Sequence, residues 1–229
     1  MAVQNGGRSL DAIAARGAGD IMVRRSVGIL VAAFLVSGVM PTNARADPQI
    51  VERFDYYDVN GMTADEIRAD LNRRGPTDSV EHRHFDAVTR WHVRWWVTYT
   101  EGGRGCKIKA VSTMVQVTYS FPRLADPTSA PAYLRQAFSQ YLERLRVHEK
   151  GHAQNAIDIA ARIEGRIRHL SPAPTCAALG QSADESGHAL IKEAIQRDVD
   201  YDAETQHGKT QGARFPRDNL PMGGGRGSD

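Results

Sequence analysis

The sequence predicts an α+β domain, in which a small antiparallel sheet packs on one long helix and is followed by a further helix and a polar loop. Three observations support this fold class. Strand-like segments gather in residues 53–121, and segments with helical spacing of apolar residues gather after residue 131. The pattern "HEKGH" at residues 148–152 lies inside the longest helical segment.

The first 46 residues are typical of a secretory signal peptide. An arginine pair at 24–25 precedes the uncharged run "SVGILVAAFLVSGVM", and alanines at 44 and 46 form a small-x-small cleavage pattern. The apolar run is shorter than the ~20 residues that a membrane-spanning helix needs. We therefore expect a bacterial chain that is exported to the periplasm or secreted, cleaved after residue 46, and without a membrane span. Met22 offers a later start, in which case residues 1–21 are not translated.

Removal of that segment changes the sign of the net charge. The whole chain has 29 basic and 27 acidic residues, a formal net charge of +2. Residues 1–46 contain five arginines and two aspartates, which leaves residues 47–229 with a net charge of −1. A nucleic-acid-binding protein needs a surplus of basic residues to neutralise phosphates. We therefore expect no nucleic-acid partner.

The two cysteines, Cys106 and Cys176, agree with export. An even number of cysteines in an exported chain predicts a disulfide bond between them. They are far apart and lack CxxC spacing, so we do not expect them to bind zinc.

The first elements of the domain are a strand and a short helix. The segment "RFDYYDVNG" at 53–61 predicts a strand that ends in a turn. Thr63 followed by Glu66 forms a capping box, which predicts a helix that ends at Gly75 and Pro76.

An antiparallel hairpin is predicted next. Residues 88–99 alternate, with Trp91, Val93, Trp95, Val97 and Tyr99 on one face, and residues 106–121 are rich in β-branched side chains. The turn "EGGRG" at 101–105 joins them. One face of this hairpin is expected to be buried, with the tryptophans in the core rather than in a ligand subsite.

A long helix is predicted from about Pro131 to Leu170. Its apolar stripe recurs at three- and four-residue steps: Leu134, Phe138, Tyr141, Leu145, Ala156, Ile159, Ile163 and Ile167. A second capping box, Ser182 with Glu185, predicts another helix to about Asp200. The polar segment 198–213 is predicted to be a loop. Since residues 214–229 are rich in Gly and Pro, we expect a disordered tail and a folded domain that spans residues 47–213.

The pattern at 148–152 carries the functional prediction. Residues four apart lie on the same side of a helix, so His148 and His152 can bind one zinc ion. Glu149 is rotated by about 100° from His148, which suits a general base that acts on water beside the metal. The small residue Gly151 leaves room for a group close to the helix. The alternative is that the two histidines are ordinary core residues on one face of the helix and bind no metal.

A catalytic zinc has three protein ligands, and the third is expected from a separate segment. Within "DVDYDAETQHGKTQGA" at 198–213, His207 is the first choice and Asp202 the second. Tyr201 is a candidate donor to the oxyanion that forms during hydrolysis. His82 and His84 are a second possible source of the ligand.

The chain resembles a family of bacterial predicted secreted zinc-dependent proteases, long filed as a domain of unknown function. The resemblance rests on "YYDVNGMTADEIRADLNRRGP", the hairpin with Cys106, "HEKGH", Cys176 and "YDAETQHGKTQGA" in this order. It implies a zincin-like metallopeptidase in which His148 and His152 bind zinc and Glu149 is the base.

The expected function is therefore an exported zinc metallopeptidase whose partner is a peptide or protein substrate. Two alternatives remain open. One is a non-catalytic zinc-binding or interaction protein of the cell envelope, and the other is a zinc amidase that acts on cell-wall amides.

Overall fold

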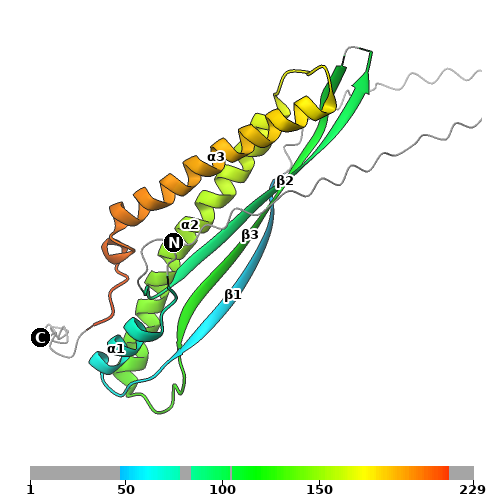
Figure 1. Cartoon of the computed structure of the whole chain (residues 1–229). Helices are drawn as coiled ribbons and strands as arrows, with labels where there is room; N and C mark the ends of the chain where they lie inside the picture. Colours follow the sequence, from blue (N-terminus) through cyan, green and yellow to red (C-terminus); the bar gives the residue numbers. More distant parts are fainter. Residues whose placement is uncertain (1–46, 78–83, 104, 217–229) are drawn as a thin grey trace, which may run out of the picture. The chain divides into compact units, whose positions relative to one another are not determined.

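The computed structural model describes residues 47–77, 84–103 and 105–216. The predicted signal peptide, His82 and most of the predicted tail lie outside the described residues. Three strands are followed by two long helices, with a short helix after the first strand, so the prediction of an α+β fold is confirmed (Figure 1). The elements are β1 (Gln49–Val59), α1 (Ala64–Arg74), β2 (Val88–Gly102), β3 (Gly105–Leu124), α2 (Ala132–Arg168), α3 (Cys176–Thr205) and a 3₁₀ turn (Lys209–Gln211).

The strands form one sheet in the order β1-β3-β2. The predicted hairpin is confirmed, since β2 and β3 pair antiparallel, with an irregularity at Thr98 and Tyr99. The prediction of an all-antiparallel sheet is wrong, because β1 pairs parallel with β3. A short turn can join only antiparallel neighbours, so the hairpin is readable from sequence. The pairing of β1 is a contact between distant segments, and no turn specifies its direction.

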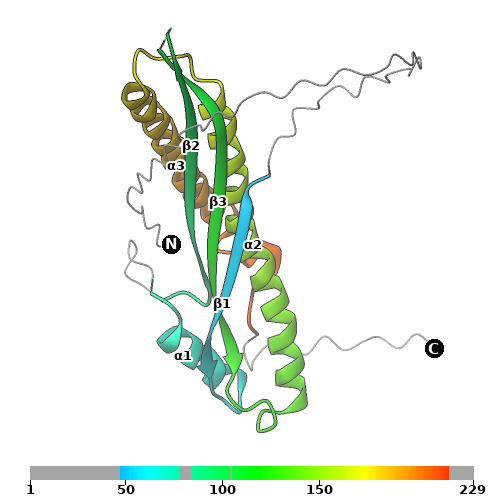
Figure 2. The same cartoon turned by 90° about the vertical axis from the view of Figure 1, so that its right-hand side faces the viewer.

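The helices α2 and α3 lie on the same face of the sheet, and α2 packs against β3 and β2 (Figures 1 and 2). The buried face of β2 is the predicted one, since Trp91 and Val93 belong to the core. The prediction that the tryptophans lie in the core is wrong for Trp96, which is 43% exposed because it points to the opposite face of the strand. The predicted stripe of α2 is confirmed from end to end, because all eight of its apolar residues are buried. This stripe fixes which side of α2 faces the sheet.

Helix α1 begins at the predicted capping box. The hydroxyl of Thr63 accepts from the backbone N–H of Glu66 at 3.2 Å, and the Glu66 carboxylate accepts from the backbone N–H of Met62 at 2.7 Å. Ile67 and Leu71 are fully buried, as their spacing predicts.

Helix α3 differs from its prediction at both ends. It begins at Cys176, because Thr175 caps it by accepting from the backbone N–H of Ala178 at 3.2 Å. The predicted cap, Ser182, lies inside the helix and donates to the carbonyl of Ala178. The helix continues to Thr205, so the first half of the predicted loop at 198–213 is helical.

The predicted disulfide between Cys106 and Cys176 is present, and it joins residues 70 positions apart. It ties the start of β3 to the start of α3.

At the other end of the domain, Phe215 is buried against the rings of Phe138 and Tyr141, so packed residues extend two positions past the predicted end of the domain. Within the described residues, no helix is both long and apolar enough to cross a membrane.

Candidate metal centre

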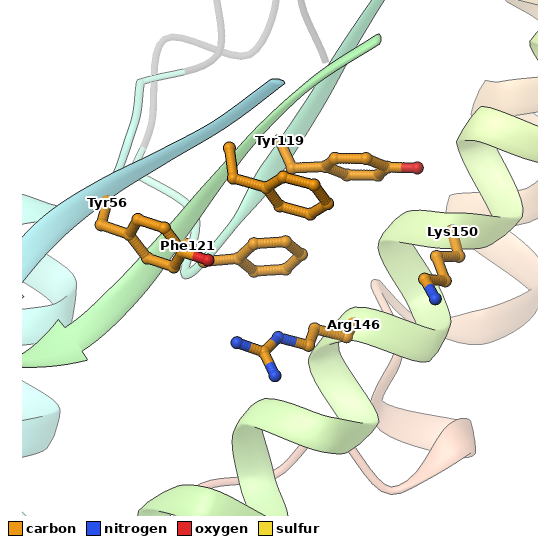
Figure 3. A pocket seen from close by; sticks show the side chains of 6 residues that line it. Tyr56, Tyr119, Phe121, Arg146 and Lys150 are labelled. Atoms are coloured by element: carbon orange, nitrogen blue, oxygen red, sulfur yellow. The ribbon is translucent and has the colours of Figure 1, made fainter. Parts of the chain in front are cut away.

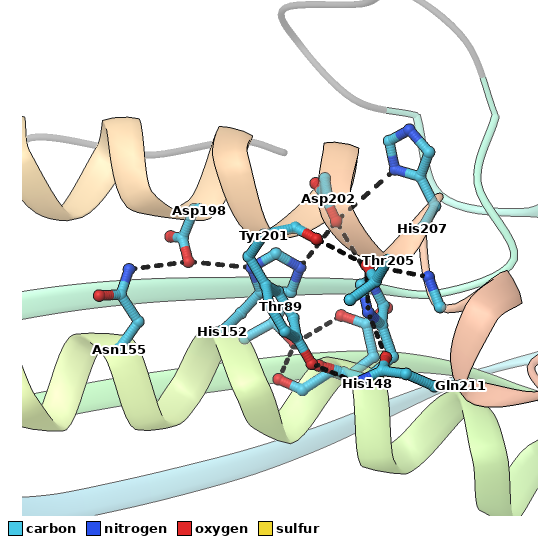
Figure 4. A network of polar contacts seen from close by, with 12 residues as sticks. Thr89, His148, His152, Asn155, Asp198, Tyr201, Asp202, Thr205, His207 and Gln211 are labelled. Atoms are coloured by element: carbon cyan, nitrogen blue, oxygen red, sulfur yellow. Dashed lines mark hydrogen bonds and ion pairs between the residues drawn. The ribbon is translucent and has the colours of Figure 1, made fainter.

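His148 and His152 lie one turn apart on α2 and point toward α3 (Figure 4). They are only 3% and 4% exposed, and their ring centroids are 4.9 Å apart. This is the common orientation that the i, i+4 spacing predicts. Both histidines interrupt the apolar stripe of α2, and both contact α3 through Asp202.

Asp202 of α3 completes a group of three metal-binding side chains. Its Oδ1 lies 3.1 Å from the Nε2 of His148 and 3.1 Å from the Nε2 of His152. Two zinc ligands at tetrahedral positions lie about 3.4 Å apart, so these separations are close to those of a zinc site. The ligand atoms of the three residues all lie within 4.8 Å of one another. Two imidazoles with one carboxylate are also a donor set that zinc binds in catalytic sites, so the residues fit the ion.

Asp198 orients His152 from the far side of its ring. Its fully buried Oδ1 lies 2.9 Å from the Nδ1 of His152 and accepts from the side-chain amide of Asn155 at 2.9 Å. Its Oδ2 accepts from the indole N–H of Trp91 at 2.7 Å. A carboxylate on the Nδ1–H directs the lone pair of Nε2 toward Asp202, as in histidines that bind zinc.

His148 is held in the same tautomer by different residues. Its Nδ1 lies 3.1 Å from Oε1 of Gln211 and 3.4 Å from the hydroxyl of Thr205. The Thr205 hydroxyl donates to the carbonyl of Tyr201 at 2.6 Å, so the Nδ1–H of His148 is assigned as donor to Gln211. Both histidines therefore present Nε2 to the position beside Asp202.

Tyr201 packs against His148 and explains the glycine inside "HEKGH". The two rings are stacked, with centroids 5.1 Å apart and an interplanar angle of 10°. The Tyr201 hydroxyl donates to the carbonyl of His148 at 3.3 Å and accepts from Gln211 at 2.9 Å. A Cβ at position 151 would overlap the phenol ring. Gly151 thus makes room for Tyr201. This confirms the prediction that a small residue at position 151 leaves space for a group close to the helix.

His207, the first choice for third ligand, lies farther from the centre. It occupies the left-handed turn after α3, with φ 52°, and its ring is 31% exposed. Its Nδ1 is 3.6 Å from Oδ1 of Asp202, and its ring lies beside Phe85. Asp202, rather than His207, contacts the Nε2 atoms of both histidines. His84 lies elsewhere, with its Nδ1 2.6 Å from the carbonyl of Gly75.

Glu149 points from the same helix toward the sheet. It is 4% exposed, and its Oε2 accepts from the hydroxyl of Thr89 on β2 at 2.6 Å. Thr89 pairs with Tyr119 of β3. Burial, the hydrogen bond to Glu52 and the charges of Glu52 and Glu149 raise the pKa of Tyr119.

The carboxylates around the histidines favour a positive charge at this point. Burial by itself lowers the pKa of His152, but hydrogen bonds to Asp198 and Asp202 and the charge of Glu149 raise it to about 10. Burial by itself raises the pKa of Asp202, but hydrogen bonds from His148, His152 and His207 hold it well below its usual range. A proton on His152 and a divalent cation therefore compete for the same place.

Several residues of this centre escaped the sequence analysis, among them Asp198, Gln211 and Thr89. A signal for Asp198 exists, because Asp198 and Asp202 have the same i, i+4 spacing as the two histidines and so lie on one side of a helix. The spacing was not used because residues 198–213 were predicted to form a loop, in which residues four apart need not share a side. Nothing in the sequence around Thr89 or Gln211 distinguishes them from other polar residues.

The fold and the centre define an α+β domain with a His-His-Asp group between its two long helices, in which both histidines are buried and the aspartate is partly buried. Residues 54–208 match a family described as "Bacterial protein of unknown function (DUF922)", and because this match covers more than half of the chain, the chain belongs to that family. The matched segment includes the three residues of the group and Glu149. No curated protein and no solved structure matches the chain.

Proposed function

We propose that this chain is a zinc-dependent hydrolase of peptide bonds, zincin-like in its use of "HEKGH". His148, His152 and Asp202 would hold the ion, and Glu149 would be the general base. The observation that carries the proposal is the position of Asp202 Oδ1, 3.1 Å from the Nε2 atoms of both histidines. The orientation of each imidazole by a partner on its Nδ1 supports the same conclusion.

The ion would polarise a substrate carbonyl and lower the pKa of bound water to about 7. In the chain itself, Thr89 donates to Oε2 of Glu149, so we assign Oε1 as the atom that accepts a proton from the attacking water. The same carboxyl group would pass that proton to the amine of the leaving peptide. For Tyr201 to stabilise an oxyanion, its hydroxyl would have to leave the carbonyl of His148.

The predicted signal peptide and the disulfide support a place for this activity outside the cytoplasm, because disulfides persist in oxidising compartments. We propose that the chain is periplasmic or secreted.

A structural zinc site is the second candidate. The observation that favours it is the burial of both histidines and of Glu149, whose carboxylate is already bonded to Thr89. In this alternative the ion would join α2 to α3 and stabilise the domain, and Glu149 would join α2 to β2.

The metal is tested first, by mass spectrometry of protein purified without chelator or nickel and then supplied with zinc. We expect about one zinc ion per chain, as in other single zinc sites. The ion should be lost in His148→Ala and Asp202→Ala and kept in His207→Ala. His169→Ala, at the exposed end of α2, is the matched control. A folded wild-type protein without zinc would refute the proposal. If zinc were lost in His207→Ala but kept in Asp202→Ala, His207 and not Asp202 would be the third ligand.

Hydrolysis is tested with a mixed peptide library and Glu149→Gln. The variant should bind zinc as the wild type does and cleave at least about 10²-fold more slowly, because it lacks the proton acceptor. Equal cleavage by both proteins would remove Glu149 from the mechanism. Zinc binding with no cleavage by either protein would favour the structural site.

A further inference from the structure

A small cavity lies on the helix-facing side of the sheet, where α2 leaves β1 uncovered (Figure 3). Its volume is about 280 Å³. This is just below the range of about 300–1,000 Å³ for pockets that hold drug-sized ligands, so the cavity suits a group of the size of one amino-acid residue. Four aromatic residues of the strands and two basic residues of α2 line it: Phe54, Tyr56, Tyr119, Phe121, Arg146 and Lys150.

The strand side of the cavity is a row of nearly parallel rings. Phe54 and Tyr119 stack with centroids 5.0 Å apart and planes at 19°, and Tyr119 and Phe121 follow with centroids 5.8 Å apart and planes at 16°. The parallel register of β1 and β3, which pairs Phe54 with Tyr119 and Tyr56 with Phe121, puts these side chains on one face. We call these four rings the aromatic shelf.

Half of the aromatic shelf is exposed. Tyr119 and Phe121 are buried, whereas Phe54 is 46% and Tyr56 45% exposed, although both face the helix layer. An exposed apolar surface of this kind marks a place where a flat apolar group can be buried. The two outer rings stay uncovered because α2 packs on β3 and β2.

The helix side of the cavity is basic. Arg146 and Lys150 lie one turn apart on α2, and in Figure 3 both face the aromatic shelf. The guanidinium carbon of Arg146 is 5.8 Å from the centroid of the Phe121 ring, within reach of a cation–π contact. Within residues 47–77, 84–103 and 105–216, neither cation forms a salt bridge. Glu52, on the same face of β1, accepts from the Tyr119 hydroxyl at 2.8 Å.

We propose that this cavity binds the C-terminal residue of a peptide that ends in an aromatic side chain. The ring would lie on the aromatic shelf, and the terminal carboxylate would pair with Arg146 and Lys150, for which an arginine fork is well suited. A C-terminal aromatic residue fits the small volume, because its ring and its carboxylate belong to the same residue. The proposal uses none of the residues His148, His152 and Asp202, so it stands apart from zinc binding and hydrolysis.

The test compares three tripeptides by calorimetry on the purified full-length chain. These are Gly-Gly-Phe with a free carboxylate, the same peptide as its C-terminal amide, and Gly-Gly-Gly with a free carboxylate. Mass spectrometry confirms that each probe stays intact during the titration. We expect the Gly-Gly-Phe acid to bind at least tenfold more tightly than either of the other two, because only it offers both the ring and the charge.

Variants assign the binding to this cavity. Arg146→Gln with Lys150→Gln should abolish the preference for acid over amide, and Phe54→Ser should weaken both forms of Gly-Gly-Phe. Arg166→Gln, an exposed cation more than about four turns away on α2, should change nothing. Circular dichroism checks that each variant is folded. If the double variant does not fold, the two single variants replace it in the test, and each should show a smaller preference for the acid over the amide.

The proposal would be overturned if the acid and the amide bound the wild type equally, or if none of the probes bound. It would also be overturned if the folded double variant still preferred the acid. Self-association of the chain that Phe54→Ser disrupts and that the Gly-Gly-Phe acid does not displace would assign the aromatic shelf to a second copy of the chain instead.

Discussion

The indole N–H of Trp91 donates a hydrogen bond of 2.7 Å to Oδ2 of Asp198, and both side chains are buried. Through this bond, β2 holds a carboxylate of α3, and the other oxygen of that carboxylate lies 2.9 Å from His152 on α2. Three elements that are distant in sequence thus meet at one carboxyl group. The orientation of His152 depends on all of them.

Asp198→Asn should weaken zinc binding about 10–100-fold, the effect usual for a lost partner of a metal-binding histidine. An asparagine must turn its amide N–H₂ either to the indole N–H of Trp91 or to the Nδ1–H of His152, so one donor faces another. Competition with a chelating dye measures the affinity. Asp200→Asn, an exposed site on the same helix, should bind zinc as the wild type does. An unchanged affinity in Asp198→Asn would mean that Asp198 does not orient the ligand.

Gly151→Ala should destabilise the domain by about 1–3 kcal/mol, because the added methyl group overlaps the Tyr201 ring and forces it away from His148. Alanine alone favours helix by about 1 kcal/mol over glycine, so the clash has to outweigh this gain. Chemical denaturation measures the difference. In Gly180→Ala, the new methyl group meets only the terminal hydroxyl of Tyr99, and little loss is expected.

The double variant Gly151→Ala with Tyr201→Ala separates the two effects. If the clash is the cause, adding Gly151→Ala to Tyr201→Ala should cost nothing or stabilise the helix. The same loss in both backgrounds would show that Gly151 is needed for another reason.

Cys106→Ala with Cys176→Ala should lower the free energy of unfolding by about 4 kcal/mol, the value expected when a disulfide closes a loop of this length. Reductant should lower the melting temperature of the wild type and leave that of the double variant unchanged. Equal melting of the wild type with and without reductant would contradict a stabilising role for the bond.

Asp70 predicts a dependence of stability on pH. Burial by itself raises the pKa of this carboxyl, but hydrogen bonds from Arg73, the backbone N–H of Asn60 and Arg74 lower it to about 2. An unfolded aspartate has a pKa of about 3.9. Because the folded value is the lower one, the stabilisation by Asp70 is present above about pH 4 and is lost as the pH falls to about 2.

Asp70→Asn should therefore cost about 1 kcal/mol at pH 7, a modest value because both arginines are exposed to solvent. The difference from the wild type should shrink between about pH 5 and pH 2, as followed by thermal unfolding. Asp158→Asn, an exposed residue of α2, should show no such trend. A difference that stays constant with pH would mean that the charge of Asp70 is not the cause.

The predictions that the structure confirms rest on short-range patterns. The faces of β2, the stripe of α2 and the capping box at Thr63 each depend on residues two to four positions apart, and the structure contains all three. The cap of α3 shows the limit of such patterns: the box of Ser182 and Glu185 predicts a start at Ser182, whereas Thr175 caps the helix. Cys176, which forms the disulfide with Cys106, is the first residue of that helix.

The amino-acid sequence by itself determined the motif residues: His148 and His152 share a helix face because of the helix period, and Glu149 must point elsewhere. Only the tertiary structure decided what those faces meet. Packing of α3 along α2 brings Asp202 to the two Nε2 atoms and Asp198 to the back of His152, across about 50 positions of sequence. The helix period relates residues that are one turn apart. The identity of the third ligand depends instead on how the buried faces of α2 and α3 pack together, and the spacing of residues within one helix does not predict that packing.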